Sequence, residues 1–338
     1  MNLQQISQIT LGAVEIKQQA DGIHFYRFTE QQQELYKRLK EEFYNKSFSS
    51  AGVRMHFRTN SDSLFLKVQT GYGSSRSYFA IDVFVNGEKL DDLNNYSGLD
   101  TNRNYTKDSF AYGEFSKEFS LGKGEKTVCI YFPWSVEIVL QQMSLDDGAI
   151  IAPVKPKKKL LCFGDSITQG YDALSPSNRY ASKLADFLEA EEYNKAIGGE
   201  VFFPALAATK EDFVPDYITV AYGTNDWNRC TKEEFICNCR DFFSNLHKNY
   251  PNVRTLVITP IWRKEMCEDR SFGSFSDVEK ILQTHTASFG NISVIRGFEF
   301  VPTDEKLFAD QRLHPNDAGF EFYFNNLVKD LKANKLFV

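Results

Sequence analysis

One serine of the sequence follows a segment that is typical of a buried β-strand. Gly164-Asp165-Ser166 comes directly after the apolar run Lys159–Phe163. Open α/β sheets bind their ligands at the carboxyl ends of parallel strands, and a backbone N–H at the start of the next helix is free to stabilise an oxyanion. The segment therefore suits a nucleophilic serine. An Asp-Ser helix cap, which is common, has the same residue types.

Three further segments carry polar residues that could act together with this serine. Asn194–Gly199 ends in two glycines, and Gly223-Thr224-Asn225-Asp226 follows a second buried-type run. His314 stands near the C-terminus, four residues after Asp310. Taken alone, these segments would be a turn, a strand-end cap and an ordinary histidine. Their order along the chain supports the hypothesis that all of them belong to one site with Ser166.

Together, the four segments resemble the SGNH (GDSL) hydrolase family over about residues 159–330. The resemblance implies that Ser166 is the nucleophile and His314 its base. It also implies an oxyanion hole made by the backbone N–H groups of Ser166 and Gly199 and the side-chain amide of Asn225. The family's chemistry requires no metal and no cofactor, so neither is expected here.

The sequence departs from the family pattern at the aspartate. The family places this residue three positions before the histidine, where Gln311 stands here, and Asp310 is one position earlier. A loop could still bring Asp310 onto Nδ1 of His314, or a backbone carbonyl could hold that nitrogen, as in relatives with a Ser–His dyad. We predict that Asp310 orients His314.

The substrate is less clearly indicated than the reaction. Trp227 directly follows the asparagine segment, and we predict that it binds substrate, although an indole there could equally pack in the core. A β-sandwich joined to an SGNH domain resembles esterases that remove acetyl groups from polysaccharides. We therefore expect short-chain, acetyl-type esters of a carbohydrate. Hydrolysis of longer acyl chains by a lipase or thioesterase, acyl transfer to a sugar, and a non-catalytic carbohydrate-binding protein are the alternatives.

Two patterns of hydrophobic residues divide the chain. Residues 22–150 contain short runs rich in aromatic and β-branched residues, and Ser63–Thr70 alternates as a half-buried strand does. Asn86-Gly87 predicts a hairpin turn. These features predict an all-β, jelly-roll-like sandwich over residues 1–150. From Lys159 onward, strand-like and helix-like segments alternate, which predicts a doubly wound, flavodoxin-like α/β/α domain with a parallel sheet over residues 156–338.

The overall composition limits the partners that we expect. A formal charge of −6 disfavours nucleic acid, and no run of about 18 apolar residues predicts a membrane span. The N-terminal segment does not resemble a secretion signal, so the prediction is a cytoplasmic protein with free thiols. None of the six cysteines forms a CxxC pair, which argues against a zinc cluster. The expected partner is a small-molecule or saccharide ester.

Overall fold

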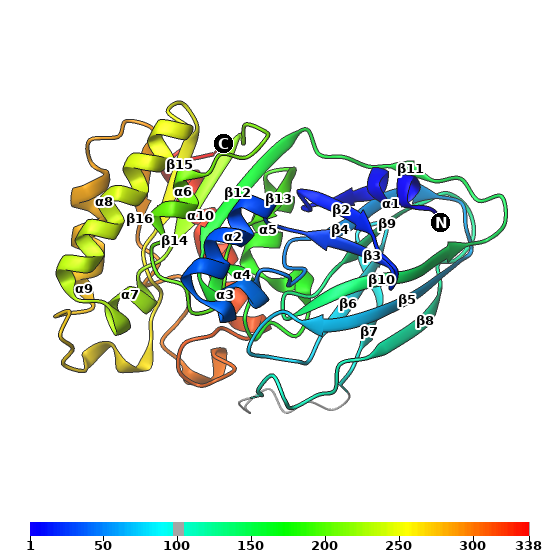
Figure 1. The fold of residues 1–338 in the computed structure, drawn as a ribbon, viewed down its shortest axis with the longest axis horizontal. Coiled ribbons are helices and arrows are strands. Elements are labelled where there is room, and N and C mark those ends of the chain that lie inside the picture. The colour runs from blue at the N-terminus through cyan, green and yellow to red at the C-terminus, as the bar shows by residue number, and fades with distance from the viewer. Residues whose placement is uncertain (97–104, 338) are drawn as a thin grey trace.

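Eleven strands form two antiparallel sheets in the first part of the described chain (Figure 1). The structure is a computed structural model and describes residues 1–96 and 105–337. The strands are β1 (Thr10–Leu11), β2 (Glu15–Gln18), β3 (Ile23–Tyr26), β4 (Arg54–Thr59), β5 (Ser63–Tyr72), β6 (Ala80–Val85), β7 (Glu88–Asn94), β8 (Glu114–Ser120), β9 (Lys126–Tyr131), β10 (Val136–Leu145) and β11 (Ala152–Pro153). One sheet has the order β1-β4-β9-β6-β7, with β11 paired to β4, and the other β2-β3-β10-β5-β8.

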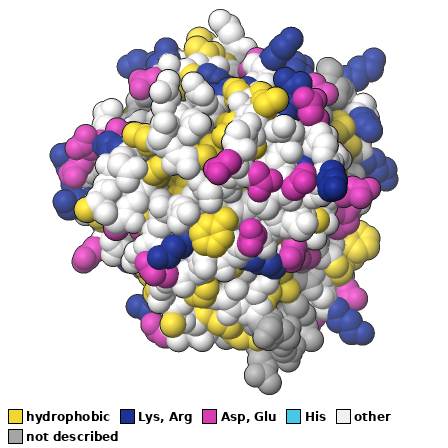
Figure 2. Space-filling model, turned by 90° about the vertical axis from the view of Figure 1, so that its right-hand side faces the viewer, with side chains coloured by type: hydrophobic (Ala, Val, Ile, Leu, Met, Phe, Trp, Pro, Cys, Tyr) yellow, Lys and Arg dark blue, Asp and Glu magenta, His cyan; other side chains and the backbone are white. Residues whose placement is uncertain are grey.

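The two sheets enclose one apolar core, which confirms the predicted β-sandwich. Alternate residues of β5, Leu64, Leu66 and Val68, are buried in this core, as the period of two predicts. Each such aliphatic side chain contributes about 1.5–3 kcal/mol when it is fully buried. Asn86 and Gly87 have φ values of 52° and 87° and join β6 to β7, so the predicted hairpin is also confirmed. On the outer face shown in Figure 2, basic and acidic side chains are interspersed, with apolar ones scattered among them.

The second part of the chain contains a five-stranded parallel sheet in the order β13-β12-β14-β15-β16. The strands are β12 (Lys158–Gly164), β13 (Ala190–Asn194), β14 (Tyr217–Ala221), β15 (Arg254–Ile258) and β16 (Ile292–Ile295). This order is that of a flavodoxin-like doubly wound sheet, whose ligand site lies where the order reverses. The reversal occurs at β12, which ends two residues before Ser166. The predicted fold class is confirmed.

Helices cover both faces of the parallel sheet (Figure 1). On one face, α5 (Tyr180–Phe187) and α10 (Asp317–Ala333) pack against alternate strand residues such as Leu160 and Cys162. On the other face, α6 (Pro204–Ala208), α8 (Lys232–Asn249) and α9 (Ser276–Thr286) pack against residues such as Leu161 and Phe163. The remaining helices are α1 (Leu3–Ile9), α2 (Glu30–Leu39), α3 (Glu41–Lys46), α4 (Ser166–Gln169) and α7 (Thr224–Arg229), with 3₁₀ turns at Pro176–Asn178, Lys264–Cys267 and Glu305–Leu307.

Helices α2 and α3 lie between strands of the sandwich in the chain but pack on the α/β core. Tyr36 and Phe43 belong to the same buried cluster as Phe202 and Tyr222. The Tyr36 hydroxyl donates to the carboxylate of Glu200 at 2.6 Å. The N-terminal part of the chain therefore contributes to the layer around the parallel sheet. Within the described residues, no helix is long and apolar enough to cross a membrane.

Candidate active site

Ser166 is the first residue of α4 and follows β12 after a single intervening residue. The carboxylate of that residue, Asp165, accepts a hydrogen bond from the N–H of Ile167 at 3.0 Å and so caps the helix. The turn is tight because a Cβ at Gly164 would lie 2.2 Å from the hydroxyl oxygen of Thr168. The strand end and the cap therefore fix the position of the serine side chain.

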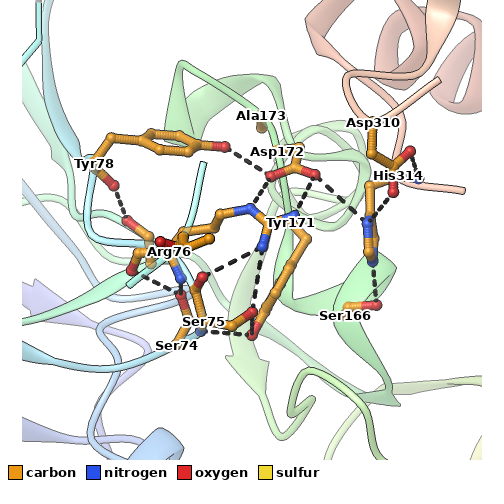
Figure 3. Close-up of polar contacts among 12 residues, drawn as sticks. Ser74, Ser75, Arg76, Tyr78, Ser166, Tyr171, Asp172, Ala173, Asp310 and His314 are labelled. Carbon is orange, nitrogen blue, oxygen red and sulfur yellow. Dashed lines mark hydrogen bonds and ion pairs between the residues drawn. The ribbon is translucent and has the colours of Figure 1, made fainter. Parts of the chain in front are cut away.

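His314 joins Ser166 to Asp310 (Figure 3). Nε2 of His314 lies 2.8 Å from Oγ of Ser166, and Nδ1 lies 2.8 Å from Oδ2 of Asp310. The other carboxylate oxygen of Asp310 accepts the backbone N–H groups of residues 312, 313 and 314 at 2.8–3.0 Å. Gln311, the extra residue relative to the family spacing, has a φ of 53°. This left-handed residue lets the aspartate reach the imidazole from four positions upstream.

The electrostatics of this group favour an imidazole that can accept a proton. Burial alone would lower the pKa of His314, but the charge and hydrogen bond of Asp310 outweigh it and raise that pKa above its usual value. Burial would raise the pKa of Asp310, yet His314 and the backbone N–H groups hold it well below its usual range. Asp310 is therefore ionised and stabilises the protonated form of its partner.

A second carboxylate, that of Asp172, lies beside the imidazole (Figure 3). Its Oδ2 is 3.5 Å from Nδ1 of His314, and its side chain is buried. Two residues of the N-terminal part hold it: Arg76 donates through Nε and Nη2 at 2.8 and 3.2 Å, and the Tyr78 hydroxyl donates at 2.9 Å. Asp172 is itself at a φ of 69°. No motif in the sequence indicated this pair, because Arg76 and Asp172 are 96 positions apart.

Tyr171 forms one wall beside the histidine. Its ring lies 5.4 Å from the imidazole centroid of His314 at an interplanar angle of 33°. Its hydroxyl accepts the backbone N–H of Ser75 at 3.2 Å. The N-terminal part of the chain thus touches both residues, Tyr171 and Asp172, that flank the imidazole.

Among the described residues, Asp172, Asp310 and His314 lie close enough together to hold a metal ion. Ligand atoms of Asp172, Asp310 and His314 lie within 4.8 Å of one another. Each carboxylate is already bonded, Asp172 to Arg76 and Asp310 to three backbone N–H groups. Together with His314 and Arg76, the two carboxylates form an ion-pair network around Nδ1 of the imidazole.

Gly199 and Asn225 open onto the same cleft as Ser166 and His314, which has a volume of about 270 Å³. Gly199 has a φ of 89°, a backbone conformation that residues other than glycine rarely adopt. The side-chain amide of Asn225 donates to the carbonyl of Glu200 at 3.0 Å. An amide nitrogen has two hydrogens, so one donor of Asn225 remains for a ligand. The cleft thus combines a nucleophile, a base and candidate oxyanion donors.

Residues 162–322 match the model of the GDSL-like lipase/acylhydrolase family. The chain thus contains a GDSL-like acylhydrolase domain, in agreement with its resemblance to SGNH-type ester hydrolases. No curated protein matches the sequence significantly.

Several solved structures are similar to this chain over both of its parts. A salicylyl-acyltransferase from a tetracycline biosynthetic pathway has a TM-score of 0.81 and 18% identity, over 97% of this chain and 94% of its own. A family two carbohydrate esterase from Clostridium thermocellum has a TM-score of 0.62 and 15% identity, over 86% and 94%. An acetyl xylan esterase from the rumen bacterium Butyrivibrio proteoclasticus has a TM-score of 0.60 and 17% identity, over 88% and 94%. The likeness shows a shared fold.

Trp227 of the acylhydrolase does not line this cleft, so the prediction that it binds substrate is wrong. Its side chain is 1% exposed, its Nε1 donates to the carbonyl of Gly273 at 2.9 Å, and Phe275 packs edge-on against it. Residues two positions apart on a helix point about 200° apart. Because Asn225 of α7 faces the cleft, Trp227 faces the core.

Proposed function

We propose that the protein is a serine esterase that hydrolyses short-chain acyl esters through an acyl-enzyme on Ser166. The observation that carries the proposal is the chain of two 2.8 Å contacts from Ser166 through His314 to Asp310, inside a cleft that Gly199 and Asn225 also line. Nucleophile, base and orienting acid in hydrogen-bond reach are the geometric signature of nucleophilic catalysis.

The proposed reaction has two halves. His314 takes the proton of the Ser166 hydroxyl as Oγ attacks the ester carbonyl, and the tetrahedral oxyanion is stabilised by N–H donors of Ser166, Gly199 and Asn225. Each such donor is worth about 3 kcal/mol in comparable sites. His314 then gives its proton to the departing alcohol, which leaves the acyl group on Ser166. In the second half, His314 takes a proton from water, the resulting hydroxide attacks the acyl carbonyl, and the proton returns to Ser166 as the acid leaves.

The proposed substrate is an acetyl-type ester of a carbohydrate. A cleft of about 270 Å³ favours a small acyl group, since it is slightly below the roughly 300–1,000 Å³ of typical ligand sites. The structural relatives include a carbohydrate esterase and an acetyl xylan esterase. A cytoplasmic location stays a prediction of the sequence.

Acyl transfer to a second hydroxyl compound is the other candidate. The likeness to a salicylyl-acyltransferase extends over 97% of this chain and favours it. An acyl-enzyme reacts with water or with an alcohol by the same chemistry, and the choice depends on which nucleophile occupies the cleft. Product analysis in the presence of sugar acceptors distinguishes the two: a new ester indicates transfer, and free acid alone indicates hydrolysis.

The test of the proposal is hydrolysis of p-nitrophenyl acetate, butyrate and octanoate by the wild type and Ser166→Ala in parallel. We expect acetate-selective activity that the substitution abolishes. Equal rates on octanoate would favour a lipase or thioesterase. Wild-type rates in Ser166→Ala would contradict the mechanism. Absence of hydrolysis together with absence of fluorophosphonate labelling would favour a non-catalytic, carbohydrate-binding role.

A further inference from the structure

Among the charged side chains that line the cleft of Ser166, basic ones outnumber acidic ones. Four of its lining residues are basic: Lys46, Arg229, Arg263 and Arg312. They come from four separate segments, the end of α3, the end of α7, the loop after β15 and the loop before His314. One lining residue is acidic, Glu42, and its carboxylate pairs with Nζ of Lys46 at 2.6 Å. The lining therefore carries more positive charge than its own acid neutralises.

Arg229 is the least compensated of the four. Its side chain is exposed, and no carboxylate of residues 1–96 or 105–337 lies within 4.0 Å of it. Nη1 donates to the carbonyl of Gly199, and a Cβ on Gly199 would lie 3.2 Å from Nη1 and 3.4 Å from Nη2. The guanidinium thus lies against the glycine that we assign to the oxyanion hole. Its other N–H donors have no acceptor in the described chain and remain for a ligand.

Arg263 and Arg312 share a single carboxylate. Nε of Arg263 lies 3.3 Å from Glu265, and the guanidinium of Arg312 pairs with the other oxygen of the same residue. Arg263 is 1% exposed, and burial together with the charge of Arg312 lowers its pKa to about 10. Two guanidinium groups with one acid leave an excess positive charge in a partly desolvated place. An anionic group of a ligand would neutralise this excess.

We propose that the ester bound by this cleft carries a carboxylate or phosphate group close to the scissile bond, and that Arg229, supported by Arg263 and Arg312, binds that group. The inference rests on the proposed function and adds the charge of the substrate to it. A guanidinium presents paired N–H donors that match the oxygens of a carboxylate or phosphate. Neutral acetyl esters need none of these charges, because the oxyanion is stabilised by N–H donors.

Three of these basic side chains also stabilise the loops of the site through hydrogen bonds. The test must separate this structural role from the binding of an anion. Lys46, Arg229 and Arg263 donate to the carbonyls of residues 198, 199 and 224. Arg229→Gln keeps an N–H donor for the carbonyl of Gly199 but removes the charge, and Arg229→Lys keeps the charge. Arg240→Gln is the matched control, because this exposed arginine lies on α8, outside the cleft, and pairs with Asp241.

The experiment compares two pairs of esters, each with one anionic member and one neutral member of similar size. The first pair is phenyl hemisuccinate and phenyl butyrate, which have acyl chains of equal length. The second pair is 4-acetoxybenzoate and its methyl ester, which carry the charge on the alcohol part. We expect the wild type and Arg240→Gln to prefer the anionic member of one pair by about tenfold or more in kcat/KM. Arg229→Gln should lose most of that preference, and Arg229→Lys should retain a large part of it.

The outcomes separate the inference from the proposed function. A preference in the first pair places the anion on the acyl group, and one in the second pair places it on the alcohol; either supports the inference. Equal rates within both pairs, or a preference that survives in Arg229→Gln, would overturn it and leave the esterase proposal intact. If no ester is hydrolysed and a fluorophosphonate does not label Ser166, the proposed function itself fails.

Discussion

Asp310→Asn changes one interaction of the site and spares the loop around it. Oδ1 of Asp310 accepts three backbone N–H groups at 2.8–3.0 Å, and an asparagine oxygen can accept the same three. Oδ2 accepts from Nδ1 of His314 at 2.8 Å, whereas the amide nitrogen that replaces it can only donate. Beside an amide, the imidazole favours the tautomer that carries its proton on Nε2. That tautomer cannot accept the proton of the Ser166 hydroxyl.

The expected loss follows from this change of tautomer. The corresponding substitution in serine proteases costs roughly 10⁴-fold in kcat. Here the carboxylate of Asp172 stays 3.5 Å from Nδ1 and can accept its proton in part of the population. We therefore expect kcat/KM to fall by about 10²–10⁴-fold. The wild-type kcat/KM rises with pH as His314 loses its proton. Since Asp310 raises the pKa of His314 against burial, this rise should move to lower pH in Asp310→Asn.

The assay is kcat/KM for p-nitrophenyl acetate as a function of pH, with thermal unfolding measured on the same samples. Asp304→Asn is the matched control, because this exposed aspartate also accepts a backbone N–H, from Lys306, but lies outside the cleft. It should keep the wild-type rate. An Asp310→Asn variant that unfolds normally and keeps more than about a tenth of the wild-type kcat/KM would refute the orienting role of Asp310.

Three further predictions concern residues around the cleft and the buried Trp227. Burial and Asp310 have the largest effects on the pKa of His314. Asp172 also raises this pKa, and Arg76 lowers it. The rise of kcat/KM with pH should therefore move to lower pH in Asp172→Asn and to higher pH in Arg76→Gln; shifts in the same direction would contradict this network. Asn225→Ala should lower kcat by about 10²–10³-fold through loss of one oxyanion donor, and an unchanged kcat would remove it from that role. Trp227→Phe should lose about 1–3 kcal/mol of unfolding free energy, seen in denaturant titration, but keep its activity; a selective loss of activity would return this residue to the substrate site.

The parts of the site that could be predicted are those whose residue types depend on local backbone geometry. Gly164 is needed because a Cβ there would collide with Thr168, and Gly199 adopts a φ of 89°. Such requirements leave a short pattern in the sequence that can be recognised. The two domain types were predictable for a related reason, since a period of two and alternating strand and helix segments reflect which faces are buried.

The features that could not be predicted depend on contacts between distant segments. Arg76 reaches Asp172 only because the sandwich packs against the α/β domain, and the cations of the cleft come from four separate loops and helices. Strand β13, Ala-Glu-Glu-Tyr-Asn, lies at the edge of the sheet and lacks the apolar pattern of the central strands. The contact of Asp310 with His314 depends on the left-handed φ of Gln311. A glutamine gives no sign in the sequence that its backbone adopts this conformation.

The most direct test of the central claim is covalent labelling by a fluorophosphonate, followed by peptide mapping. The account predicts one modified residue, Ser166, with labelling that is lost in Ser166→Ala and slowed in Asp310→Asn. Both effects follow because the reagent reacts with a serine that His314 activates. Labelling at another serine, or undiminished labelling of the Ser166→Ala variant, would contradict the assignment of the nucleophile and with it the proposed mechanism.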